Sequence, residues 1–281
     1  MNIVDLINDG SNKLKVKKIL SHRLDSEILL SKVLKKEREK IIINQHERVS
    51  SKEMLEFSDL IKRRSLNEPI AYIIKEKEFW SKKFFVNNHT LIPRPETELM
   101  VEKLSQIFKN KSISILDIGT GSGCILISLL SELKHSKGLG IDISIKALHV
   151  AKKNALKHNI INNVIFLRRS FTHIYNKKFD LIVSNPPYIK RKDIKNLDAD
   201  VKRYEPLLAL DGGNDGLDVI KKVIYKANYI LKIKGMLALE IGNEQYRKVS
   251  KILNRNNFRI EHIIEDYKDN KRCIISSNFN K

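Results

Sequence analysis

The stretch Asp117-Ile-Gly-Thr-Gly-Ser-Gly123 decides the fold, because its closely spaced glycines join a short apolar run to a helical pattern. Residues 113–118 are predicted to form a strand, and residues 124–133 the helix that follows the turn. Glycines permit a tight turn at such a junction and let a ligand approach the backbone. The stretch, from Asp117 through Gly119, Thr120, Gly121, Ser122 and Gly123, is therefore predicted to be a nucleotide-type binding loop.

Strand and helix patterns alternate from residue 112 onward, which predicts a mostly parallel sheet. Strands are expected at 113–118, 138–143, 164–168, 179–184 and 236–241, with a closing pair at 258–266 and 272–276. The other helices are expected at 144–158, 217–231 and 245–254. Asp142 lies at the end of the second strand, where a carboxylate can accept hydrogen bonds from both ribose hydroxyls.

The turn Asn185-Pro-Pro-Tyr188 follows the fourth predicted strand and carries the most specific chemistry. Asn185 offers a side-chain carbonyl, and the Pro186 carbonyl is a second acceptor, because Pro187 has no N–H to compete beside it. Tyr188 supplies a flat ring. Two acceptors and a ring suit a planar NH2 group, which we expect this turn to position for attack on an electrophile. The alternative is a proline-rich turn that simply ends a buried strand.

Three segments are expected: a helical domain at 1–75, a β-hairpin and linker at 76–98, and an α/β domain at 99–281. Ser50 and Glu53 form a capping box for one N-terminal helix, and Pro69 is expected to end the helical stretch. The helical domain serves either to recognise a macromolecular substrate or only to stabilise the chain. The hairpin turn is expected near residues 81–83, and Arg94 between two prolines belongs either to a site or to a bare linker.

Composition narrows the class of protein. With 281 residues, 42% of them hydrophobic, the chain is globular, and no apolar run is long enough to span a membrane. Two cysteines without paired spacing and no signal-peptide pattern indicate a cytoplasmic protein without a metal site. The net charge of +20 fits either a basic surface near RNA or ribosomes or the compositional drift of an AT-rich genome.

The glycine turn, the acidic residue after the second strand and the Asn-Pro-Pro-Tyr turn together resemble class I S-adenosylmethionine-dependent methyltransferases. The resemblance extends over the chain to the PrmC/HemK family of peptide chain release factor glutamine methyltransferases. It is carried, in order, by Arg63-Arg64, Glu68-Pro-Ile-Ala-Tyr72, Glu78-Phe-Trp80, Leu91-Ile-Pro-Arg-Pro-Glu-Thr-Glu98, Leu116-Asp-Ile-Gly-Thr-Gly-Ser-Gly123, Val183-Ser-Asn-Pro-Pro-Tyr-Ile189, Tyr204-Glu-Pro206 and Leu239-Glu-Ile-Gly242.

This resemblance implies a Rossmann-like seven-stranded sheet with a small helical bundle, and methylation of the glutamine side-chain amide in the Gly-Gly-Gln motif of class I release factors. S-adenosylmethionine is the implied cofactor, held by the glycine turn, Asp117, Asp142, Phe171 and Asn185, while the Asn-Pro-Pro-Tyr turn binds the substrate. Neither nucleic acid nor a membrane is required, and a monomer is expected. Ser170 and Phe171 stand where the family commonly has an acid and an aromatic residue near the adenine.

Two other functions compete with this one. A DNA adenine-N6 or RNA guanine-N2 methyltransferase would use the same turn on an exocyclic amine, and the positive charge would favour nucleic acid. However, we identify no separate target-recognition domain after the catalytic core in the sequence. A protein that binds S-adenosylmethionine without catalysis is the second rival, suggested by Ser170 but disfavoured by the intact Asn-Pro-Pro-Tyr turn.

Overall fold

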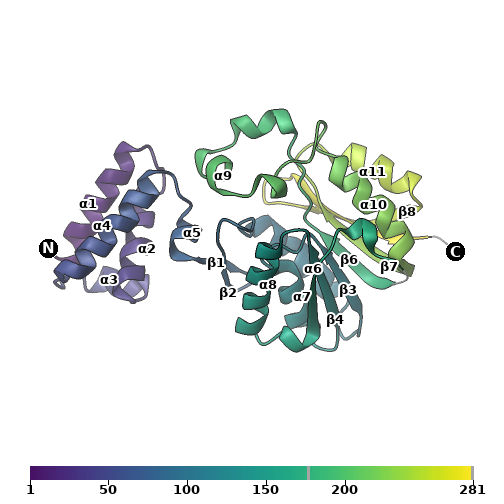
Figure 1. The fold of residues 1–281 in the computed structure, drawn as a ribbon, viewed down its shortest axis with the longest axis horizontal. Coiled ribbons are helices and arrows are strands. Elements are labelled where there is room, and N and C mark those ends of the chain that lie inside the picture. Colours follow the sequence, from purple (N-terminus) through teal and green to yellow (C-terminus); the bar gives the residue numbers. More distant parts are fainter. Residues whose placement is uncertain (176–177, 280–281) are drawn as a thin grey trace. The chain divides into compact units, whose positions relative to one another are not determined.

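The computed structural model describes residues 1–175 and 178–279, and it divides into two compact units (Figure 1). The first contains Met1–Glu76 together with Asp198–Tyr204. The second contains Lys77–Leu197 and the described residues from Glu205 onward. No helix in the described part of the chain is long and apolar enough to cross a membrane.

The first unit is helical. Its elements are α1 (Ile3–Val16), α2 (His22–Leu34), α3 (Arg38–Ile43), α4 (Ser51–Ser65), α5 (Ile70–Ile74) and α9 (Ala199–Tyr204). Leu29, Leu30 and Phe57 are among the apolar side chains of its core. The predicted capping box is confirmed, since Ser50 caps α4 and exchanges hydrogen bonds with Glu53. The expectation that Pro69 ends the helices is wrong, because Pro69 stands at the N-cap of α5.

A buried ion pair ties two helices of this unit together. Arg64 Nε on α4 donates to Asp25 Oδ2 on α2 at 2.7 Å, and both residues are buried. The neighbouring Arg63 pairs with Glu68, with its Nε 2.8 Å from Glu68 Oε2. These members of the arginine and Glu-Pro motifs therefore hold the bundle together internally.

The second unit is built on a seven-stranded sheet with the strand order β5-β4-β3-β6-β7-β9-β8. Its strands are β3 (Ser114–Ile118), β4 (Lys137–Asp142), β5 (Val164–Arg168), β6 (Phe179–Ser184), β7 (Leu231–Glu240), β8 (Phe258–Glu265) and β9 (Lys271–Asn278). Strands β3 to β7 run parallel, and β9 is antiparallel to both neighbours. The predicted class of sheet is confirmed, although β7 begins at Leu231, several residues before its expected start.

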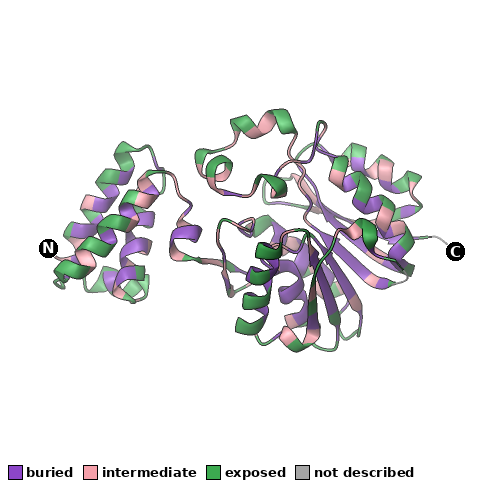
Figure 2. Ribbon diagram, viewed as in Figure 1, coloured by how far each residue is buried: buried purple, intermediate pink, exposed green. Residues whose placement is uncertain are grey.

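Helices cover both faces of this sheet (Figure 1). One apolar cluster joins it to α6 (Glu98–Ile107), α7 (Cys124–Glu132) and α8 (Ile145–Lys157), and another to α10 (Asp218–Ile230) and α11 (Tyr246–Arg255). Because the inner strands β3, β4, β6 and β9 are covered on both sides, they are mostly buried (Figure 2). Short 3-10 segments lie at Pro95–Thr97 (η1), Ile161–Asn163 (η2), Phe171–His173 (η3), Arg191–Asn196 (η4) and Leu207–Ala209 (η5).

The hairpin of β1 (Glu76–Phe79) and β2 (Lys82–Phe85) differs from its prediction by about one residue. Its turn is Trp80-Ser81, with positive φ angles of 53° and 52° at the two residues. Two such residues make a tight turn whose twist matches that of the strands. Trp80 is consequently a turn residue, and its indole N–H donates to Glu132 Oε1 at 2.8 Å.

Strand order creates a crevice between β3 and β6. Strand β3 is followed along the chain by β4 on one side, whereas its neighbour on the other side is β6. Because the crossovers leave these two strands in opposite directions, a gap opens beyond their carboxyl ends, the usual ligand site of such sheets. The glycine turn follows β3 and the Asn-Pro-Pro-Tyr turn follows β6, so both predicted motifs meet at this gap.

Candidate active site

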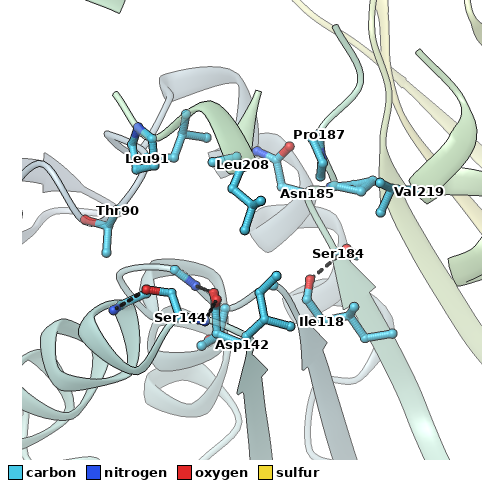
Figure 3. A pocket seen from close by; sticks show the side chains of 18 of the residues that line it. Thr90, Leu91, Ile118, Asp142, Ser144, Ser184, Asn185, Pro187, Leu208 and Val219 are labelled. Carbon is cyan, nitrogen blue, oxygen red and sulfur yellow. Dashed lines mark hydrogen bonds between the residues drawn. The ribbon is translucent and has the colours of Figure 1, made fainter. Parts of the chain in front are cut away.

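A cavity of about 770 Å³ lies at the carboxyl ends of the parallel strands, within the size range of small-molecule sites. Figure 3 shows Asn185 and Leu208 on one side of it and Asp142 and Ser144 on the opposite side. The predicted site residues that line it are Gly119, Thr120, Gly121, Ser122, Asp142, Phe171, Asn185, Pro186 and Pro187. The fold thus brings together residues from both motifs.

Three predicted residues lie outside this lining. In the described structure Asp117, Gly123 and Tyr188 are not among the side chains that border the cavity. Asp117 is buried under the glycine turn, and Tyr188 packs against the apolar cluster on the α10 and α11 side of the sheet. The influence of Gly123 and Tyr188 on a bound ligand must therefore pass through the residues that they hold.

The three glycines of the turn have different roles. All have left-handed backbone angles, with φ of 74° at Gly119, 54° at Gly121 and 80° at Gly123. A Cβ atom at Gly119 would meet nothing within 4 Å, and one at Gly121 only the Gly119 carbonyl at 3.9 Å. A Cβ at Gly123 would lie 2.9 Å from Ile127 Cδ1. The first two glycines leave room for a ligand, whereas the third allows close packing.

The Asp142 carboxylate stands at the end of the cavity formed by β3 and β4. Asp142 Oδ2 accepts a hydrogen bond from the Gly121 N–H at 3.1 Å, and its Oδ1 accepts one from the Ser144 N–H at 2.9 Å. Asp142 therefore fixes the glycine turn and the start of α8, and it keeps further lone pairs for a ligand hydroxyl. Burial raises the pKa of Asp142 above its usual range.

Asp117 has an unsatisfied oxygen. Its Oδ2 accepts from the Thr120 hydroxyl at 2.7 Å, but its buried Oδ1 has no hydrogen-bond partner among the described residues. Burial raises the pKa of Asp117 to about 7, and the negative charge of Asp142 adds to that shift. A buried acceptor without a partner calls for a donor, and a ligand ammonium group, directly or through water, would supply one.

The Asn-Pro-Pro-Tyr turn is held by hydrogen bonds to Thr97, Glu240 and Gln245. Asn185 Nδ2 donates to Thr97 Oγ1 at 3.5 Å, and the Tyr188 hydroxyl donates to Glu240 Oε1 at 3.4 Å. The Tyr188 carbonyl accepts from Gln245 Nε2 at 2.9 Å. Tyr188 was expected to offer its ring to a planar substrate group, whereas its contacts in the structure hold the turn in place.

The arginine of the Ile-Pro-Arg-Pro segment has a definite partner. Arg94 Nη2 donates to Glu205 Oε1 at 2.5 Å, and the Ile92 N–H donates to Glu205 Oε2 at 3.1 Å. Arg94 also lines the cavity. The segment is therefore fixed at the wall of the cavity, and Arg94 is one of the residues that border it.

Thr97 and Glu240 have no predicted role, although both belong to motifs that carry the family resemblance. Thr97 Oγ1 donates to Glu240 Oε2 at 2.6 Å, and both residues are buried beside the Asn185 turn. Their proximity depends on tertiary structure, because 143 positions separate them along the chain. The sequence signal that could have identified them is the presence of a hydroxyl residue and an acidic residue inside two of the motifs that carry the family resemblance.

Comparisons with known proteins agree with this geometry. Residues 5–74 match the family model described as PrmC N-terminal domain, and residues 95–201 match the Methyltransferase small domain. The release factor glutamine methyltransferase of Buchnera aphidicola subsp. Schizaphis graminum is 47% identical over 263 residues, covering 92% of this chain and 94% of that protein. The chain belongs to the release factor glutamine methyltransferase family. The protein of that name from Buchnera aphidicola subsp. Acyrthosiphon pisum is 41% identical over the whole length of both chains.

Other relatives of this methyltransferase are longer. A bifunctional methyltransferase of Rickettsia typhi is 38% identical and covers 99% of this chain, which spans 58% of its length. Among solved structures, a methyltransferase from Pyrococcus furiosus superimposes with a TM-score of 0.54 at 17% identity, over 79% of this chain and all of that one. This likeness supports the class I methyltransferase fold. The family and the fold make S-adenosylmethionine the cofactor.

The two classes of glycine can be separated by substitution. Gly121→Ala is expected to weaken S-adenosylmethionine binding, because the methyl group enters the space beside the cavity. Gly123→Ala is expected to lower the melting temperature by roughly 5–10 °C, more than Gly121→Ala, because it adds overpacking against Ile127 to the left-handed strain that both substitutions share. Thermal unfolding and calorimetric titration of both variants test this division. Equal stability losses in both, with equal binding, would contradict it.

Asp117 should make the stability of the protein depend on pH. Its pKa of about 7 in the folded protein lies above the usual 3.8, so the folded state holds the proton more tightly than the unfolded state. The corresponding stabilisation is complete below about pH 4 and is lost as the pH rises through about 7. The side chain in Asp117→Asn cannot ionise. The melting temperature of this variant should therefore exceed that of the wild type by more at pH 8 than at pH 5, and each kcal/mol of added stability corresponds to roughly 2–4 °C. The same increase at both pH values would refute this assignment.

Proposed function

We propose that this chain transfers a methyl group from S-adenosylmethionine to the side-chain amide nitrogen of the glutamine in the Gly-Gly-Gln motif of class I peptide chain release factors. The observation that carries the proposal is that Asn185 and Pro186 line the same cavity as the glycine turn and Asp142, with Asn185 and Asp142 on opposite sides of it (Figure 3). A substrate amide held at this turn would lie next to a cofactor held by the glycine turn. Membership in the family supports the choice of substrate.

The residues present suit the cofactor. Asp142 would accept hydrogen bonds from the ribose hydroxyls, and the unsatisfied oxygen of Asp117 would orient the ammonium group. The open space at Gly119 and Gly121 lets the cofactor approach the backbone. Phe171 on η3 borders the cavity and would pack against the adenine, with Ser170 beside it. When bound, S-adenosylmethionine supplies an electrophilic methyl group on a positively charged sulfur.

The Asn-Pro-Pro-Tyr turn would orient the nucleophile. An amide nitrogen is a weak nucleophile because its lone pair is delocalised into the carbonyl group. Asn185 Oδ1 and the Pro186 carbonyl would accept hydrogen bonds from the two N–H groups of the substrate amide. These bonds would direct the nitrogen lone pair toward the methyl group. Positioning and electrostatics then carry the reaction without a strong base, since the nitrogen becomes acidic once it bears the methyl group and releases its proton afterward. Tyr188 holds the turn.

The rest of the proposal concerns partners and location. The N-terminal domain predicted at 1–75 would recognise the release factor, since the family model that covers residues 5–74 accompanies the methyltransferase domain. The enzyme acts as a monomer in the cytoplasm, where release factors and ribosomes are found. Nucleic acid is not required for the reaction, although the net charge of +20 is compatible with work close to the ribosome.

Transfer of a labelled methyl group from S-adenosylmethionine tests this function. The acceptors are a purified class I release factor, the same factor with its motif glutamine changed to alanine, duplex DNA and ribosomal RNA. We expect label on the unaltered factor only. Label on DNA or RNA, with none on the factor, would replace this function by nucleic-acid methylation of an exocyclic amine.

A further inference from the structure

We propose that Thr97 and Glu240 are positioning residues that fix the side-chain amide of Asn185 with its oxygen directed to the substrate. This inference rests on the proposed function, because it assigns the support of the same catalytic turn. Thr97 is on η1, Asn185 follows β6, and Glu240 ends β7. Three separate elements therefore meet at one buried polar group.

The sheet register places Asn185 and Glu240 together. Ser184 at the end of β6 lies opposite Leu239 on β7. The residues that follow these two along the chain are Asn185 and Glu240, so they are neighbours as well. Thr97 bridges them, because its Oγ1 is 2.6 Å from Glu240 Oε2 and 3.5 Å from Asn185 Nδ2. Glu240 Oε1 also accepts from the Tyr188 hydroxyl, so that one carboxylate holds both ends of the Asn-Pro-Pro-Tyr turn.

The chain of donors and acceptors has a fixed direction. An ionised carboxylate can only accept, so the Thr97 hydroxyl must donate to Glu240. The Thr97 oxygen then has only lone pairs left, and the Asn185 group that faces it must be the NH2 donor. A flipped Asn185 amide would place two acceptors against each other. The orientation found leaves Asn185 Oδ1 for the substrate, which is the acceptor that the reaction requires.

Burial shows that the carboxylate serves more than packing. Glu240 is 4% exposed and Thr97 is 3% exposed. Glu240 lies on β7 opposite Cys273 of β9. Isolating a carboxylate from water is costly, and an apolar side chain would fill such a core position at lower cost. The two oxygens of Glu240 are instead used on Thr97 and Tyr188. Its polar contacts thus point to the catalytic turn.

Protonation of Glu240 would remove this directionality, because a neutral carboxyl group can donate to Thr97. Burial raises the pKa of Glu240 to about 7. The titratable and charged groups that face it are Tyr188 after β6, Cys124 on α7, and Arg272 and Cys273 on β9. Arg272 opposes the rise, but its Nε is already paired with Asp266 Oδ2 at 2.7 Å. The wild-type kcat is consequently expected to rise with pH around neutrality.

The test compares Thr97→Val, which keeps the shape, with Thr97→Ser, which keeps the hydroxyl. Thr97→Val is expected to lower kcat toward the release factor by about 10- to 100-fold, because the bond to a charged group is lost. KM and S-adenosylmethionine affinity should change much less, and Thr97→Ser should recover most of the rate. Glu240→Gln should lower kcat and flatten its rise around neutral pH. An unchanged kcat in Thr97→Val, or a Ser variant as slow as the Val variant, would overturn the inference.

A second measurement does not depend on the substrate. The side-chain amide 1H and 15N signals of Asn185, assigned from their loss in Asn185→Asp, report the environment of its NH2 group. We expect these signals to shift in Thr97→Val and to return in Thr97→Ser. If they are the same in all three proteins, the inference fails. If they shift as expected but the wild type leaves the release factor unmethylated, the proposed function fails while the positioning contact remains.

Discussion

Asn185→Ala is expected to reduce kcat for methyl transfer by about 10²- to 10³-fold, the usual loss when one preorganised polar contact to a reacting group is removed. The variant lacks the acceptor for the substrate N–H, so the amide lone pair is no longer directed at the methyl group. Steady-state rates with a release factor, measured beside the melting temperature, give the result. The fold should be intact, because the hydrogen bond from the Asn185 side chain to Thr97 is long, at 3.5 Å, and contributes little to stability.

Asn256→Ala is a matched control for this variant. Asn256 lies just past α11, and its side chain donates to the Ile252 carbonyl at 2.8 Å. It does not border the cavity, so its loss should leave the rate within about twofold of the wild type. A wild-type rate in Asn185→Ala would remove the Asn-Pro-Pro-Tyr turn from the mechanism.

The second large effect is expected at Asp142. Asp142→Ala should weaken S-adenosylmethionine binding by roughly 100-fold or more, because the two charge-assisted hydrogen bonds that we propose between its carboxylate and the ribose would be lost. The substitution also frees the N–H groups of Gly121 and Ser144, which the carboxylate now holds in place. Asp142→Asn keeps one acceptor, so its S-adenosylmethionine affinity should lie between those of the wild type and Asp142→Ala. Calorimetric titration of the cofactor measures all three affinities.

Asp59→Ala on the exposed face of α4 is the control for loss of one negative charge. Its cofactor affinity should equal that of the wild type. If Asp142→Ala also binds S-adenosylmethionine like the wild type, the ribose contact is wrongly assigned. The glycine turn would then hold the cofactor by itself.

Local signals made much of the fold predictable. The glycine turn, Asp142 and the Asn-Pro-Pro-Tyr turn are each read from a few neighbouring residues, and a parallel sheet brings strand ends to one edge. The strand at residues 164–168 and the strand at 179–184 have the predicted bounds. The hairpin turn lies at Trp80-Ser81 and not near residues 81–83, because two residues with side chains adopt left-handed angles there. Composition alone does not indicate such angles.

The support of the turn could not be predicted in the same way. The Asn-Pro-Pro-Tyr pattern predicts a substrate-facing ring at Tyr188, and it does not reveal that the Tyr188 hydroxyl reaches Glu240. Thr97 and Glu240 meet only after η1 and β7 are packed together in the folded chain. Gly123 likewise looks like its two neighbours in sequence, and only its contact with Ile127 shows that it serves packing.

Tandem mass spectrometry of a release factor after reaction with this protein and S-adenosylmethionine tests the central claim most directly. The predicted result is one methyl group on the side-chain amide nitrogen of the glutamine in the Gly-Gly-Gln peptide, absent after reaction with Asn185→Ala. A methyl group on another residue, or an unmodified factor in a reaction that labels nucleic acid, would contradict the account.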